Sequence, residues 1–144
     1  MVVKEMAVYY KKRQVGKGPE GVQVMTSADV ARVFAFLKEK AHEECWVACL
    51  AADNTISAIY QVSKGAVTSA DVDPREVFKA ALLANASSVI LVHNHPTGNP
   101  SPSGADREVT KRIKEAGKLL SIPLIDHIVV SDHRHASFVE MGIL

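Results

Sequence analysis

The feature that most constrains this chain is an apolar run that ends in two histidines. Residues 87–92 read SSVILV, and His93-Asn94-His95 follows at once. Apolar residues in a row, without alternation, are typical of a strand buried on both faces of a sheet. Because helical and strand patterns alternate along the chain, we expect an α/β domain of three α/β/α layers around a mixed sheet. His93 would then stand at the carboxyl end of an inner strand.

The other elements follow from periodicity and from capping residues. Thr26 with Asp29, Asp73 with Pro74, and Ser103 with Asp106 resemble helix starts. They predict helices at residues 27–40, 74–85 and 103–120. Apolar stretches separated by turn signals, such as Asp53-Asn54, predict strands near residues 43–51, 55–63, 87–92, 124–132 and 135–142.

Length and composition limit the number of domains and the kinds of function that the chain can have. A chain of 144 residues suits one domain, here residues 26–144, preceded by an arm or edge strand at residues 1–25 that contains the glycine and proline break VGKGPEG at 15–21. A net charge of +1 leaves nucleic-acid binding possible but unsupported. We expect a cytoplasmic protein with free Cys45 and Cys49 and no membrane span.

The spacing of His93 and His95 is that of a metal site. Residues two apart in an extended chain project to the same side, so two imidazoles can reach one ion. Catalytic zinc usually takes three protein ligands and keeps a fourth position open. We choose Asp106 as the third ligand, since the proline-rich loop 96–102 can return the chain toward the histidines. The simpler alternative is that Ser103 and Asp106 only cap a helix and that the histidines are ordinary surface residues.

The same residues resemble a known family. His93-x-His95, seven residues, Ser103, two residues and Asp106 is similar to the signature of JAMM (JAB/MPN-type) metalloproteases. The longer stretch DPREVFKAALLANASSVILVHNHPTGNPSPSGAD, followed by TKRIKEAGKLLSIPLIDHIVVSD, resembles the RadC-type JAB domain from about Val24 to the C-terminus. The resemblance implies a cytidine-deaminase-like JAB/MPN architecture and one Zn²⁺ ion.

The resemblance also implies an upstream glutamate and a hydrolytic reaction. Matching of the following strand favours Glu43 as general base, and Glu44 stays an alternative because both faces of that strand are apolar. Ser103 would donate to the oxyanion while an amide bond, peptide or isopeptide, is hydrolysed. The implied partner is a peptide or protein substrate of unknown identity, and the oligomeric state is open.

Several features limit this interpretation. Thr97 stands where such domains usually have serine, and the helix-hairpin-helix segment of full-length RadC proteins has no counterpart here, so no DNA-binding role is carried over. A non-catalytic metal-binding domain in DNA repair or another nucleic-acid process is the alternative function. His127 is expected to be a core or supporting histidine, His133 and His135 to lie in a turn, and His42 to be a solvated residue at a helix end.

Overall fold

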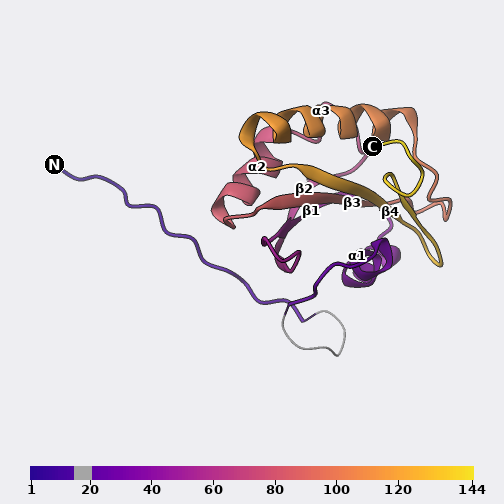
Figure 1. Ribbon diagram of the computed structural model, residues 1–144, viewed down its shortest axis with the longest axis horizontal. Helices are drawn as coiled ribbons and strands as arrows, with labels where there is room; N and C mark the ends of the chain where they lie inside the picture. The colour runs from indigo at the N-terminus through magenta and orange to yellow at the C-terminus, as the bar shows by residue number, and fades with distance from the viewer. Residues whose placement is uncertain (15–20) are drawn as a thin grey trace.

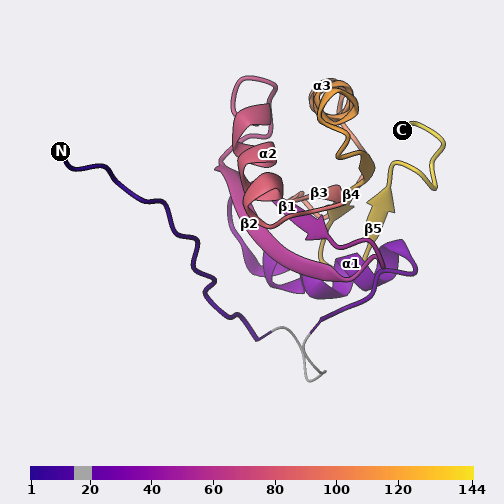
Figure 2. The same cartoon turned by 60° about the vertical axis from the view of Figure 1, so that its left-hand side comes forward.

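The computed structural model describes residues 1–14 and 21–144 and has the expected α/β architecture. The strands are β1 (Glu44–Leu50), β2 (Ile56–Lys64), β3 (Ser88–Asn94), β4 (Leu124–Val130) and β5 (His135–Ser137). The helices are α1 (Ser27–Val33), the 3₁₀ helix η1 (Ala35–Glu39), α2 (Pro74–Leu83) and α3 (Gly104–Leu120). Figures 1 and 2 show α2 and α3 on one side of the sheet and α1 on the other. The predicted layers and mixed sheet are confirmed, and the likeness to cytidine deaminases stays a prediction.

The sheet places the histidine-bearing strand at its centre. The order of the five strands is β2-β1-β3-β4-β5. Strand β3 runs antiparallel to β1 and parallel to β4, and all seven of its residues are buried. The absence of alternation in SSVILV therefore reflects burial on both faces, as the sequence predicted.

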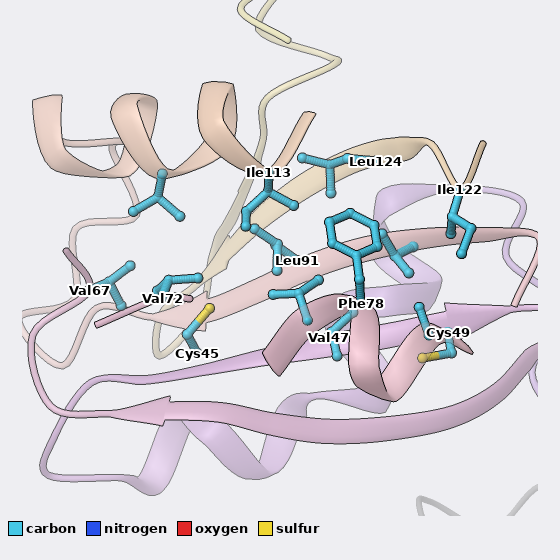
Figure 3. Close-up of a cluster of buried hydrophobic side chains, with 14 residues drawn as sticks. Cys45, Val47, Cys49, Val67, Val72, Phe78, Leu91, Ile113, Ile122 and Leu124 are labelled. Carbon is cyan, nitrogen blue, oxygen red and sulfur yellow. The ribbon is translucent and has the colours of Figure 1, made fainter. Parts of the chain in front are cut away.

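Side chains of alternating residues fill two separate cores. Figure 3 shows the core between the sheet and helices α2 and α3, which includes Cys45, Val47, Leu91 and Phe78. Trp46, Ala48, Ile90 and Val92 point to the opposite side, where they pack against α1 and η1. A residue's face on β1 or β3 is thus set by whether its number is odd or even. His93 continues the odd series and faces α3.

Two predicted elements differ from the structure. The helix expected over 27–40 is an α-helix only to Val33, and a 3₁₀ helix follows from Ala35. Phe34 and Leu37 are both fully buried, and the 3₁₀ repeat of three residues per turn brings positions three apart onto the same side. The strand expected over 135–142 is paired only from His135 to Ser137, because turns follow it.

Close backbone packing explains a glycine inside α3. A Cβ atom on Gly117 would lie 2.5 Å from the carbonyl oxygen of Ile122, too close for any side chain. The glycine that weakens the helix pattern is therefore needed where the chain turns back toward β4.

The N-terminal region contributes little regular structure. Residues 1–14 contain no helix or strand, and a single bridge joins Gln23 to Thr55 at the edge of the sheet. Most of the break predicted at 15–21 lies outside the described residues. Within the part of the chain that the structure describes, no helix is both long enough and apolar enough to cross a membrane.

Candidate metal centre

The end of β3 and the start of α3 bring three polar side chains to one point. His95 follows the strand directly, and its backbone N–H donates to the carbonyl of Val130 on β4. The chain then turns at Gly98, whose φ of 86° is in the left-handed region, and returns to the N-terminus of α3. The strand end and the helix end therefore face each other, as the loop composition predicted.

The three predicted ligands form one cluster. His93 Nε2 lies 3.0 Å from His95 Nε2, and each of these nitrogens lies 3.2 Å from an oxygen of Asp106. His93 and Asp106 are buried, and His95 is mostly buried. Among the described residues these are the three that together could hold a metal ion. The structure brings them together, whereas their role as ligands stays a prediction.

Hydrogen bonds fix which nitrogen of His93 carries a proton. The Thr110 hydroxyl donates its one proton to the carbonyl of Asp106, so it must accept from Nδ1 of His127, 2.6 Å away. His127 Nε2 therefore carries a lone pair and accepts from Nδ1 of His93 at 2.7 Å. This leaves the lone pair of His93 Nε2 directed into the cluster.

His95 is oriented in the same way by a different partner. Its Nδ1 lies 2.8 Å from the carbonyl oxygen of Asn99, which can only accept, so Nδ1 carries the proton and Nε2 the lone pair. Two imidazole lone pairs and a carboxylate thus converge on one point. Such an arrangement needs a cation, and imidazole with carboxylate is a donor set for zinc and similar divalent ions.

The electrostatics of the cluster agree with this need for positive charge. Contact with Asp106 raises the pKa of His95, with smaller help from the Asn99 carbonyl and the charge of Glu43. Burial would raise the pKa of Asp106, but the two imidazoles, which can donate to its carboxylate whenever Nε2 is protonated, outweigh burial and hold that pKa well below its ordinary value. In the absence of a metal, a proton competes for the same place.

Ser103 and Asp106 also cap a helix, as the simpler alternative predicted, but that alternative is wrong in placing His93 at the surface, because His93 is fully buried. Ser103 N–H donates to Asp106 Oδ2 at 2.8 Å, and Asp106 N–H donates to Ser103 Oγ at 3.0 Å. The capping box does not occupy Asp106 Oδ1, which contacts His93 Nε2. It also does not use the proton of the Ser103 hydroxyl, which is available for donation. Capping and metal binding are therefore compatible.

The structure separates the two candidate glutamates. Glu43 is partly exposed and belongs to the odd series that faces α3, and its charge acts on both Cys45 and His95. Glu44 is buried on the other side, where its carboxylate accepts from Gln61 at 2.7 Å and lies 3.8 Å from Lys40. Only Glu43 is on the side of the histidines.

The other four histidines of the chain lie outside the cluster of candidate ligands. His127 is fully buried against His93, and burial together with the neighbouring His93 lowers its pKa well below the ordinary value. His133 lies in a bend, whereas His135 begins β5 and contacts Ser27, so the predicted turn ends one residue earlier than expected. His42 is exposed, as predicted.

Two further residues near the cluster do not join it. Asp126 accepts from Ser137 and from the amides of His127 and Val139, so it supports β5 and no ligand. Cys45 is paired with His93 across the strands, is buried and free, and burial above all raises its pKa to about 12.

Sequence reasoning missed Thr110 and Asn94, since nothing in their local pattern marks their distant partners.

Comparison with known proteins agrees with this geometry. Residues 24–143 match the RadC-like JAB domain. The chain is 42% identical over 118 residues to a UPF0758 protein of Trichlorobacter lovleyi, which covers 79% of this chain and 51% of that protein. It is 51% identical over 96 residues to one of Caldanaerobacter subterraneus, covering 67% and 41%. A third, from Salinibacter ruber, is 40% identical over 126 residues, covering 87% and 54%.

The family match and the matches to individual relatives differ in extent. The chain spans about half the length of the curated relatives that it matches. The family match itself covers almost the whole sequence and includes both histidines, Ser103 and Asp106. This chain therefore belongs to the RadC-like JAB domain family.

Proposed function

We propose that the domain is a zinc-dependent hydrolase of amide bonds, with His93, His95 and Asp106 as the ligands of one ion. The observation that carries the proposal is the convergence of one nitrogen from each of His93 and His95 with the carboxylate of Asp106, with Glu43 on the same side of the sheet. When bound, zinc supplies Lewis-acid chemistry that brings the pKa of water near 7 in sites of this kind. The substrate class is a peptide or isopeptide bond.

Glu43 acts as the general base in this scheme. One of its carboxylate oxygens, Oε2, is held at 3.0 Å by the amide of Val67. The other oxygen accepts no hydrogen bond from a described residue, so it is available to take a proton from the attacking water and pass it to the leaving amine. Partial exposure gives that proton a route to solvent.

Ser103 stabilises the negative charge that develops on the carbonyl oxygen. Its own oxygen accepts from the Asp106 amide, which fixes the position of the hydroxyl at the start of α3. The hydroxyl proton is not used in this hydrogen bond and is available for donation. Loss of one such donor costs roughly 3–4 kcal/mol of transition-state stabilisation in other hydrolases.

The test compares the two neighbouring glutamates. Zinc-loaded protein is incubated with a proteome-derived peptide library, and new N-termini are detected by mass spectrometry. We expect Glu43→Gln to lower the cleavage rate at least about 100-fold at unchanged zinc content, because proton transfer is lost. Glu44→Gln is the matched control and retains cleavage, since Glu44 faces Gln61.

Other results would count against the hydrolase. Equal cleavage by wild type and Glu43→Gln contradicts the role of Glu43 as general base. No cleavage by zinc-loaded wild type contradicts the hydrolase and favours a non-catalytic metal-binding domain. Binding to DNA with a steep dependence on salt would point to the nucleic-acid role instead. That role has little support in the net charge of +1, and Arg13, in the basic run at residues 11–13, lies over the rings of Phe36 and Trp46.

A further inference from the structure

Asn94 lies between the two predicted ligands but does not join them. It is the last residue of β3 and is 1% exposed. Its side-chain oxygen accepts from the backbone N–H of Glu44 at 2.7 Å, and its side-chain nitrogen donates to the carbonyl of His42 at 3.0 Å. The two hydrogen bonds therefore bracket Glu43 on both sides.

This arrangement replaces backbone pairing where the sheet ends. The register between β1 and β3 begins at Cys45 opposite His93, and no pair precedes it. Residues 42–44 would be free to fray on that side, as strand ends do. A side-chain amide has the same donor and acceptor as a peptide group, so Asn94 continues the ladder by one step.

Glu43 is held from three directions as a result. On the side of β2, the amide of Gly65 donates to the Glu43 carbonyl at 2.8 Å. On the side of β3, Asn94 holds the two neighbouring residues. The amide of Val67 holds one carboxylate oxygen. Continuing the antiparallel register by two residues places Glu43 opposite His95.

We propose that Asn94 is a positioning residue that ties Glu43 to the end of β3, where both histidine ligands lie. This inference rests on the proposed function, in which Glu43 is the base. Ligands and base come from different strands, and small errors in their separation are costly, since a displacement of about 1 Å can lower a rate roughly 100-fold. Asn94 makes them one rigid unit.

The first readout does not depend on activity. In metal-free protein, amide hydrogen exchange is measured at Glu44, which reports the Asn94 bond, and at Val67, which reports the Glu43 carboxylate. We expect both amides to exchange at least about tenfold faster in Asn94→Ala. Gln61→Ala is the matched control, because it removes an amide hydrogen bond to the side chain of Glu44 and leaves Asn94 intact.

The second readout is kinetic. Zinc-loaded Asn94→Ala should show kcat lowered roughly 10- to 100-fold, with KM and zinc affinity within about threefold of wild type. In a Glu43→Gln background the same substitution should change kcat little, because the positioned group is already inactive. If Asn94→Ala does not fold, Asn94→Asp is measured in its place by the same readouts: it keeps the volume and the acceptor for Glu44, replaces the donor to His42 with an oxygen and adds a buried carboxyl group.

The outcomes separate this inference from the hydrolase itself. Unchanged exchange at Glu44 and Val67 overturns the role of Asn94, and so does a loss of zinc affinity that accounts for the whole fall in kcat. Additive effects of Asn94→Ala and Glu43→Gln overturn it as well. If zinc-loaded wild type cleaves nothing, the proposed hydrolase fails, and the exchange data alone then decide whether Asn94 positions Glu43.

Discussion

The N-termini of α1 and α3 have the same local design and different surroundings. Each begins with a hydroxyl residue followed three positions later by an aspartate, Thr26 with Asp29 and Ser103 with Asp106. In both, the aspartate accepts from the backbone N–H of the capping residue, at 2.9 Å and 2.8 Å. The two helix starts share this sequence pattern, although Ser103 Oγ accepts from the Asp106 amide whereas the Thr26 hydroxyl donates to Asp29.

The difference lies in what each aspartate meets with its other oxygen. Asp29 Oδ1 pairs with Arg32 on its own helix, and its side chain is 20% exposed. Asp106 Oδ1 faces His93, and its side chain is 2% exposed. A capping box therefore supplies an oriented carboxylate, and only the strand that ends opposite it turns the carboxylate into part of a candidate metal site.

The largest expected difference between the two helix starts is in metal binding. Asp106→Asn keeps an oxygen that can accept from the Ser103 amide but removes the charge, so we expect zinc affinity to fall at least about 100-fold. Asp29→Asn should leave zinc affinity unchanged. Isothermal titration with Zn²⁺ checks both variants. Stoichiometric, equally tight metal in wild type and Asp106→Asn would remove Asp106 from the ligand set.

A smaller difference is expected one turn further along. Four residues after the aspartate, α1 has the apolar Val33, whereas α3 has Thr110, which determines the proton positions on His127 and His93. Thr110→Val removes that control, and we expect zinc affinity to fall about tenfold. Thr110→Ser keeps the hydroxyl and should retain wild-type affinity. Equal affinity in all three proteins, measured by competition with a chelator, would show that the tautomer needs no hydroxyl.

The smallest effect concerns pH and the exposed cap. Hydrogen bonds from the amides of Thr26 and Met25 lower the pKa of Asp29. A carboxyl with a lowered pKa in the folded state stabilises the fold above its unfolded pKa of about 4, and this contribution is lost as the pH falls through the folded value. Asp29→Asn should therefore reduce the free energy of unfolding by less than about 1 kcal/mol at pH 6 and by even less at pH 3. Urea unfolding at both pH values measures this, and an equal loss at the two would contradict it.

Local patterns predicted much of the fold because they act over a few residues. The capping pairs located the first residues of α1 and α3, and the apolar run located β3. The end of α1 at Val33 was missed, since the packing of Phe34 and Leu37 on the sheet decides it. Propensity cannot encode such tertiary contacts.

Local patterns predicted only part of the candidate site. His93 and His95 are two residues apart, so strand geometry alone brings them to one side. Asn94 and Thr110 could not be found in this way, because their partners lie 50 and 17 residues away in the chain. The choice between Glu43 and Glu44 needed the register of β1, which puts the two side chains on opposite faces.

The buried thiol of Cys45 bears on which metal ions this domain could bind. Cys45 is adjacent to His93 across the strands, yet with a pKa of about 12 it stays protonated at neutral pH. Its sulfur is not part of the three-residue cluster, whose ligand atoms are therefore nitrogen and oxygen beside a cysteine. Imidazole and carboxylate donors suit zinc and similar divalent ions, whereas thiophilic ions such as cuprous copper prefer thiolate.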